Sequence, residues 1–295
     1  MIKTSNLSKS YGSIKAIDDV SIEIRPKEIY GFIGPNGAGK STTIKTLLNF
    51  IFADSGSATI DDLDIVLNSK QVKERVAYVS SENNLYPNLT ALEVIEFKEK
   101  IHGEKDQKEK ERLIKLFKIE EDKKIENMSL GNKKKVAIVS ALILNTPIII
   151  LDEPTSGLDP LMQNILFSEL KRLKKENKTI FISSHNLKEV QDHCDRVALI
   201  RSGKIIKVIS LKDMLKEGKY VRVKGVVSGV DKIADKILME KENETSFIFT
   251  RKIQDLILFL SKFEIENLII ENLSIEHQFL EYYSSEEDSL WKTYI

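Results

Sequence analysis

The feature that most constrains this chain is a glycine-rich segment, G-P-N-G-A-G-K-S, at Gly34–Ser41. It follows a short apolar run, Glu28–Ile33, and leads into Lys40–Phe50, which we predict to be a helix. A strand, a glycine loop of the pattern G-x-x-x-x-G-K-[ST] and a helix indicate an α/β fold that binds phosphate. The glycines let the backbone curl so that several N–H groups point at phosphate oxygens, and the positive end of the helix adds to the attraction.

Individual residues of this loop have expected roles. Lys40 is predicted to bridge the β- and γ-phosphates of a nucleotide, and Ser41 to ligate Mg²⁺. A glycine-rich turn without function is the alternative, and the strand–loop–helix context disfavours it. The other candidate nucleotide-binding residues of the loop are Gly34, Asn36, Gly37, Gly39 and Thr42.

A second apolar run, Ile148–Leu151, ends in the acidic pair Asp152 and Glu153. Four apolar residues fit a buried central strand, whose carboxyl end opens at a nucleotide crevice. We therefore expect Asp152 to hold Mg²⁺, through water, and Glu153 to act as general base on an attacking water. An ordinary acidic turn is the alternative reading of the pair, and the presence of two such motifs in one chain disfavours it.

Composition limits the function classes that remain. The chain of 295 residues carries 45 basic and 45 acidic residues, which removes the simplest argument for a nucleic-acid binder. The only cysteine, Cys194, cannot form an internal disulfide and favours a reducing compartment. The N-terminus lacks the apolar run of a signal peptide, and the most apolar stretch, Val136–Leu151, is interrupted and too short to span a bilayer. We expect any membrane role to come through a separate partner chain.

Strand and helix patterns alternate over residues 1–214, which predicts a mostly parallel sheet flanked by helices. A charge-rich, helical insertion of about 82–144 interrupts this alternation, with amphipathic segments at Ala91–His102 and Lys108–Phe117. A further helix is expected at Leu161–Glu176. The expected strands outside the glycine motif are Ile2–Lys9, Ala16–Ile24, Ser57–Ile60, Ala77–Ser80, Ile148–Asp152, Thr179–Ser183 and Arg196–Arg201.

A second, smaller α+β unit is predicted over residues 215–295. Its order of strand, helix, strand, strand, helix, strand is that of a ferredoxin-like sandwich. The stretch K-E-N-E at Lys241–Glu244 suits a hairpin turn, and a last helix is expected at Ser274–Tyr283. The six expected elements are Tyr220–Val227, Val230–Ala234, Lys236–Lys241, Thr245–Arg251, Gln254–Phe263 and Asn267–Leu273.

The order of these motifs resembles the ATPase subunits of ABC transporters over roughly Met1–Lys212. Besides the glycine loop and the acidic pair, the chain carries S-L-G-N-K at Ser129–Lys133 and S-G-L-D at Ser156–Asp159, which are similar to the signature and D-loop of that family. The resemblance implies a P-loop NTPase core with a helical subdomain, and two ATP molecules sandwiched in a head-to-tail dimer. It implies that Ser129 and Gly131 clamp the ATP of the opposite subunit and that Asp159 lies where the dimer interface is crossed. Ser129 can also be a simple helix N-cap, which is compatible with the clamp.

Three further positions carry implied roles. His185, in I-S-S-H, resembles the switch histidine that contacts the γ-phosphate. Tyr11 resembles the aromatic residue that stacks on adenine, with a plain packed aromatic as the alternative. The family usually has a glutamine near a Mg²⁺ ligand position at the start of the insertion, where this chain has Ser81 followed by Glu82. We assign the position to Ser81, with Glu82 as the alternative.

Several details are similar to bacterial exporters of drugs, bacteriocins and other peptides. They are N-N-L-Y-P-N-L-T at Asn83–Thr90, the variant signature, and the tail Ser274–Tyr283. The resemblance implies an ATP hydrolase that uses ATP and Mg²⁺, works as a homodimer or with a paralogous ATPase, and binds a separate integral membrane permease but no nucleic acid. It places the chain in the cytoplasm, on the inner face of the cell membrane.

Two alternative functions remain. One is a soluble ABC ATPase that acts on ribosomes or nucleic acid. Such relatives carry two cassettes in one chain or long coiled coils, whereas the insertion here is only about sixty residues. The other is a nucleotide-binding regulator without hydrolysis, which Glu153 and His185 argue against.

Overall fold

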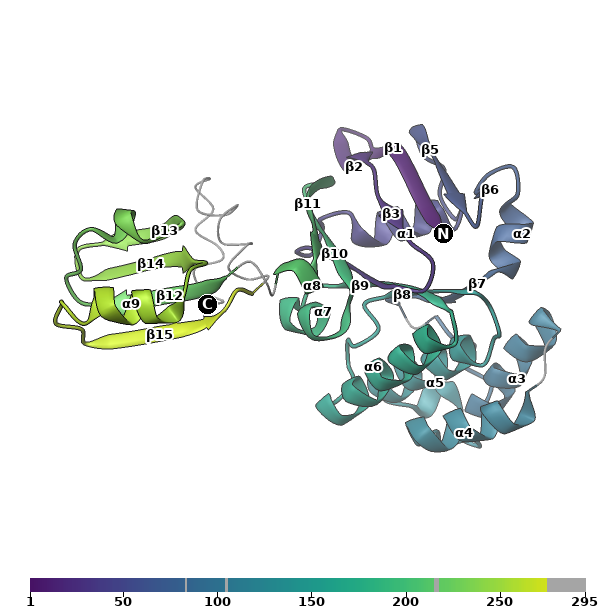
Figure 1. Ribbon diagram of the computed structural model, residues 1–295. Helices are drawn as coiled ribbons and strands as arrows, with labels where there is room; N and C mark the ends of the chain where they lie inside the picture. The colour runs from purple at the N-terminus through teal and green to yellow at the C-terminus, as the bar shows by residue number, and fades with distance from the viewer. Residues whose placement is uncertain (83, 104–105, 215–217, 275–295) are drawn as a thin grey trace. The chain divides into compact units, whose positions relative to one another are not determined.

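The structure is a computed structural model that describes residues 1–82, 84–103, 106–214 and 218–274. The chain divides into two compact units, Met1–Val208 and Ile209–Ile295. Figure 1 shows the elements of both. Within the described ranges, no helix has the length and apolar character that a membrane crossing requires.

A six-stranded sheet with the order β11-β10-β4-β9-β8-β7 forms the centre of the first unit. The neighbours from β10 to β7 are parallel, as the alternating pattern predicted. Every residue of β4, β8 and β9 is buried, because helices or a second sheet cover both faces, and this explains their nearly continuous apolar sequence. The strands are β4 (Ile29–Ile33), β7 (Val76–Val79), β8 (Ile148–Asp152), β9 (Thr179–Ser184), β10 (Arg196–Arg201) and β11 (Lys204–Ser210).

An antiparallel sheet of order β2-β1-β5-β6, with β3 also paired to β1, lies on one side of the central sheet (Figure 1). Helix α1 (Lys40–Leu47) packs in the apolar cluster between the two sheets. The single strand expected at Ala16–Ile24 is wrong, because the chain leaves the extended ladder at Ser21 and Ile22 and the two parts pair with different ends of β1. The strands are β1 (Ile2–Tyr11), β2 (Ile14–Val20), β3 (Glu23–Ile24), β5 (Ser55–Ile60) and β6 (Leu63–Asp64), and the short helix α2 (Ser69–Glu74) follows them.

The helical insertion lies on the other side of the central sheet (Figure 1). The expected segment Ala91–His102 is confirmed as α3, which begins with a reciprocal capping box between Thr90 and Glu93. The second expected segment is α4, and both pack with α5 and α6 on one apolar cluster. The remaining elements here are α4 (Gln107–Phe117), the 3₁₀ turn η1 (Ile125–Asn127), α5 (Leu130–Leu142), α6 (Pro160–Lys175) and α7 (Leu187–His193).

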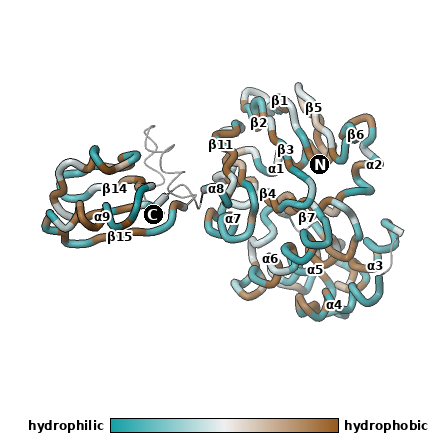
Figure 2. Tube along the Cα trace, in the orientation of Figure 1, coloured by the Kyte–Doolittle hydropathy of each residue, from teal (hydrophilic) through white to brown (hydrophobic). Residues whose placement is uncertain are grey.

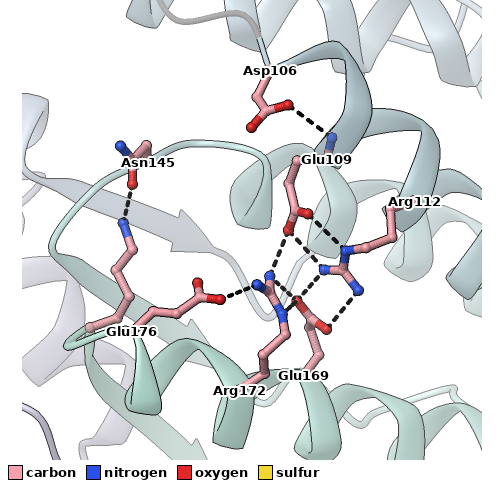
Figure 3. A network of polar contacts seen from close by, with 8 residues as sticks. Asp106, Glu109, Arg112, Asn145, Glu169, Arg172 and Glu176 are labelled. Atoms are coloured by element: carbon pink, nitrogen blue, oxygen red, sulfur yellow. Dashed lines mark hydrogen bonds and ion pairs between the residues drawn. The ribbon is translucent and has the colours of Figure 1, made fainter.

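A network of charged side chains joins α4 of the insertion to α6 of the core (Figure 3). Nη2 of Arg112 lies 2.6 Å from Oε1 of Glu169, whose side chain is only 4% exposed. Nη2 of Arg172 lies 2.6 Å from Oε1 of both Glu109 and Glu169. Two guanidinium groups thus compensate a buried carboxylate, which would be costly alone.

The second unit is an antiparallel sheet of order β13-β14-β12-β15 that packs against α9. The four expected strands are confirmed, and Figure 2 shows apolar residues along α9. The helix expected at Val230–Ala234 is wrong: it is a single 3₁₀ turn, η2 (Val230–Lys232), because a segment this short gains few helical hydrogen bonds. The helix expected from Ser274 lies outside the described residues apart from Ser274 itself. The other elements are α8 (Leu211–Met214), β12 (Lys219–Lys224), β13 (Lys236–Lys241), β14 (Glu244–Phe249), α9 (Ile253–Leu260) and β15 (Asn267–Asn272).

Candidate nucleotide site

The glycine loop and Glu153 of the acidic pair meet in one pocket, although more than a hundred residues separate them in the sequence. The loop leaves β4 and ends at Gly39, the N-cap of α1. Gly39 has a φ of 103°, and a Cβ there would come within 2.4 Å of the Ala16 carbonyl oxygen, so the loop requires glycine at this position. The residues that line the pocket are Ala16, Asn36, Gly37, Gly39, Lys40, Ser41, Thr42 and Glu153.

Lys40 is buried at the floor of this pocket, with 4% of its surface exposed. Its Nζ donates to the carbonyl oxygens of Gly34, at 2.7 Å, and Pro35, at 3.1 Å. The same Nζ lies 3.1 Å from Oε1 of Glu153. The ammonium group is therefore fixed by the backbone of its own loop and faces the carboxylate at the end of β8.

Glu153 has a partner at each carboxylate oxygen. Oε1 pairs with Lys40, and Oε2 lies 3.0 Å from Nδ1 of His185, which follows β9. Burial raises the pKa of Glu153, but the hydrogen bonds and charges of Lys40 and His185 outweigh burial and leave that pKa below its ordinary value. The structure thus brings Lys40, Glu153 and His185 together, with Glu153 in the ionised form that a base requires.

Asp152, the other member of the acidic pair, is completely buried. Its Oδ1 accepts a hydrogen bond of 2.5 Å from the hydroxyl of Ser183 on β9. Its Oδ2 has no hydrogen-bond partner within the part of the chain that the structure describes. Ser183 was not predicted as a site residue, and the only sequence signal for it is a polar residue in an apolar strand.

Lys134 is a second residue that the sequence did not reveal. This lysine of α5 is 1% exposed, and its Nζ donates to the carbonyl oxygens of Ser80, at 3.0 Å, and Ser81, at 3.1 Å. Burial lowers the pKa of Lys134 despite the opposing charges of Asp152 and Glu153. The lysine therefore ties the loop after β7, which carries the assigned sensor Ser81, to the helix that begins with the signature. Ser81 is half-buried, whereas Glu82 is exposed.

The signature and D-loop residues form a separate group. The hydroxyl of Ser129 caps α5 by accepting from the N–H of Asn132 at 3.3 Å, and Asp159 caps α6 by accepting from the N–H of Met162 at 2.9 Å. A Cβ on Gly131 would come within 2.5 Å of the Gly157 carbonyl oxygen, so the two segments pack backbone to backbone. Among the described residues, none of this group lines the pocket of Lys40.

Tyr11 lies at the end of β1 and is 51% exposed. Its ring has Lys9 Nζ at 5.8 Å from the centroid, within the range of a cation–π contact. It does not line the pocket among the described residues, and half of its surface remains open to a ligand.

Comparison with known proteins shows the family of the chain. Residues 17–156 match the family model described as ABC transporter. The chain is 36% identical over 226 residues, 74% of this chain and 72% of the relative, to the bacitracin transport ATP-binding protein BcrA of Bacillus licheniformis. It is 33% identical over 237 residues, 78% of this chain and 76% of the relative, to the linearmycin resistance ATP-binding protein LnrL of Bacillus subtilis.

A solved structure of the same kind is the cassette MJ0796, described as the dimeric structure of a post-hydrolysis state bound to ADP and Pi. It is 27% identical to this chain, with a TM-score of 0.66 over 72% of this chain and 99% of MJ0796. The expected fold class, an α/β P-loop core with a helical insertion and a small second unit, is confirmed. The chain belongs to the family of ABC transporter ATP-binding proteins and is an ATP-binding and ATP-hydrolysing subunit.

Proposed function

We propose that hydrolysis takes place in the pocket of Lys40 and that Glu153 is its general base. The observation that carries this proposal is the convergence of Lys40, Ser41 and Glu153 on one pocket, with His185 bonded to Glu153. Lys40 binds the β- and γ-phosphates, and Glu153 accepts a proton from the attacking water. His185 contacts the γ-phosphate, and the exposed ring of Tyr11 stacks on adenine.

The donor atoms in and beside this pocket fit Mg²⁺. The cation prefers hard oxygen ligands, and the unpaired, buried Oδ2 of Asp152 is such an oxygen. The Ser41 hydroxyl, Asp152 and Ser81 would hold the cation. When bound, Mg²⁺ neutralises charge on the phosphates.

We also propose that two cassettes complete each site together. Ser129 and Gly131 stand at the N-terminus of α5, where the positive end of the helix favours a phosphate. They clamp the γ-phosphate of the ATP that the opposite cassette holds. Asp159 lies at the interface between the two cassettes. The related cassette MJ0796 is described as dimeric, which supports this arrangement. The opposite cassette is a second copy or a paralogue.

The transported compound is proposed from the relatives. BcrA is named for bacitracin transport and LnrL for linearmycin resistance, so we assign this chain to the export of an antibiotic, drug or peptide. A separate membrane permease carries out the transport, and the chain works on the cytoplasmic face of the membrane.

The permease has a candidate docking place on the first unit. A groove beside the insertion exposes aromatic side chains, with Phe50 54% and Tyr86 57% exposed. Tyr86 meets Phe97 edge to face, with ring centroids 5.5 Å apart. Exposed aromatic residues in a concavity favour a protein partner. The groove includes Ser80 and Glu82, so a partner in it touches the loop of Ser81.

The variant Glu153→Gln tests the assignment of the base. It keeps the shape of the side chain but removes the carboxylate, so we expect ATP binding to persist and turnover to fall by about 100-fold or more. The closed dimer then accumulates in ATP, measured by light scattering. Glu74→Gln, an exposed change on α2, is the control and keeps wild-type turnover. Wild-type turnover by Glu153→Gln would contradict the proposal.

A further inference from the structure

Ser183 occupies a position in β9 where its hydroxyl meets both members of the acidic pair. The residue is completely buried, and its Oγ lies 2.5 Å from Oδ1 of Asp152 and 3.0 Å from the backbone nitrogen of Glu153. A backbone N–H can only donate, so the Ser183 oxygen accepts from Glu153. Its single hydrogen is therefore directed at Asp152. Both bonds have a fixed direction, and the carboxylate oxygen must be an acceptor.

Because of this contact, the two carboxylate oxygens of Asp152 have different surroundings. Oδ1 is engaged by Ser183, while Oδ2 is buried and has no partner within the described ranges. A buried carboxylate oxygen without a partner is costly, so its retention points to a ligand. If the carboxylate rotated, the Ser183 bond would break. Ser183 thus holds Oδ2 in one orientation.

The same side chain supports the backbone of Glu153. Glu153 has a φ of 46°, a left-handed conformation that residues other than glycine rarely adopt. Its N–H is shared between the carbonyl oxygen of Ser183, at 3.2 Å, and the Ser183 hydroxyl, at 3.0 Å. This turn directs the Glu153 side chain toward Lys40 and His185, which bind its two oxygens.

We propose that Ser183 is a positioning residue that fixes both halves of the catalytic pair. It presents Oδ2 of Asp152 to the divalent cation, and it holds the backbone turn that aims Glu153 at the attacking water. The inference rests on the proposed MgATP site and assigns to β9 a role beyond carrying His185. It requires no contact between Ser183 and the nucleotide.

The test is Ser183→Ala in the full chain, which removes the hydroxyl with little change in volume. Binding of Mn²⁺ to the protein with a non-hydrolysable ATP analogue is followed by electron paramagnetic resonance, and ATPase activity is measured in parallel. We expect the half-saturating Mn²⁺ concentration to rise by about 10-fold or more, because a hydrogen bond to a charged group is lost. The turnover number falls by a similar factor. Affinity for the analogue without divalent cation stays unchanged, because the glycine loop is intact.

A double-mutant cycle shows whether Ser183 acts through Asp152. In an Asp152→Asn background, Ser183→Ala should add little to the loss of Mn²⁺ affinity. If Ser183→Ala weakens Mn²⁺ binding by the same factor in the Asp152→Asn background as in the wild-type chain, the inference is wrong.

Thr4→Val is the matched control for losing a buried hydroxyl. Thr4 is 3% exposed and likewise donates one bond, to the Val20 carbonyl at 2.9 Å, and accepts one, from the N–H of Ile22 at 2.9 Å. Thr4→Val should lower the melting temperature but leave the Mn²⁺ affinity unchanged. If Ser183→Ala also lowers only the melting temperature, Ser183 is merely structural and the inference is wrong. If the wild-type chain binds no Mn²⁺ with nucleotide, the proposed MgATP site itself fails.

Discussion

Single side chains in the nucleotide site hold one another through directed contacts. Glu153 is bound at one oxygen by Lys40 and at the other by His185. These three residues were predicted from the sequence, because each stands in a motif with a fixed place beside a strand or a loop. Ser183 and Lys134 were not, because a serine in a strand and a lysine in a helix acquire their roles only from tertiary contacts.

Substitutions of Ser129 can separate its two expected roles, the N-cap of α5 and the clamp on the ATP of the opposite cassette. Ser129→Asp keeps an N-cap side chain for α5, so the melting temperature should stay within a few degrees of wild type. It also places a negative charge where the phosphate of the opposite cassette is expected, so ATPase activity should fall by about 100-fold. Ser129→Asn, which caps without charge, should retain much more activity. Equal activity of the Asp and Asn variants would show that Ser129 is only a cap.

Among the elements, those with a strong local pattern were predicted best. β4, β8 and β9 are short apolar runs with every residue buried, and α3 shows its amphipathic period between a Thr90 cap and Gly103. The short elements α2, α7 and β11 were missed, because six or seven residues give little periodicity and depend on their neighbours. The position of the insertion helices on α6 also depends on contacts that no local pattern encodes.

The network between α4 and α6 predicts a dependence of stability on pH. The hydrogen bond from Arg112 lowers the pKa of Glu109 by more than burial raises it. The pKa therefore lies below its ordinary value of 4.5. A carboxylate with a depressed folded-state pKa stabilises the fold above the unfolded-state pKa, and this contribution is lost as the pH falls through the folded-state pKa. Glu109→Gln should therefore be less stable than wild type at pH 7.

Urea unfolding of the wild type and of Glu109→Gln, from pH 7 down to pH 3, measures the contribution of this network. The difference in unfolding free energy between wild type and Glu109→Gln should shrink as the pH falls below about 4.5. Glu111→Gln, an exposed change on the same helix, serves as the control for removing a carboxylate. A difference that stays constant over this range would show that the charge of Glu109 contributes nothing to the fold.

At the scale of the whole molecule, each of the two units has a core of its own. The first contains the pocket of Lys40, and the second buries Val221, Phe247 and Leu256 in a separate apolar cluster. We propose that the second unit, residues 215–295 in the expected division, strengthens contact between cassettes and carries no catalytic group.

A chain that ends at Met214 tests this proposed role. Because the pocket residues all precede that point, the truncated protein should bind ATP with wild-type affinity. Its turnover at saturating protein should match the full chain, while the protein concentration for half-maximal activity should rise by about 10-fold. If the truncated protein folds but turns over no ATP at any concentration, the second unit contributes more than contact.

We propose that each ATP is hydrolysed between two cassettes. Mixing two inactive variants tests this most directly. Lys40→Ala removes the proposed phosphate lysine but keeps Ser129, and Ser129→Asp keeps Lys40 but disrupts the proposed clamp. In a mixed dimer, one site combines an intact Lys40 with an intact Ser129 from the other copy.

The measurement is the ATPase rate of the equimolar mixture, with each variant alone and the wild-type dimer as references. We predict that each variant is inactive alone and that the mixture recovers up to about one quarter of the wild-type rate, since half of the dimers are mixed and each has one complete site. A mixture no more active than the two variants separately, under conditions where mixed dimers are shown to form, would contradict the claim that the site is completed by the opposite cassette.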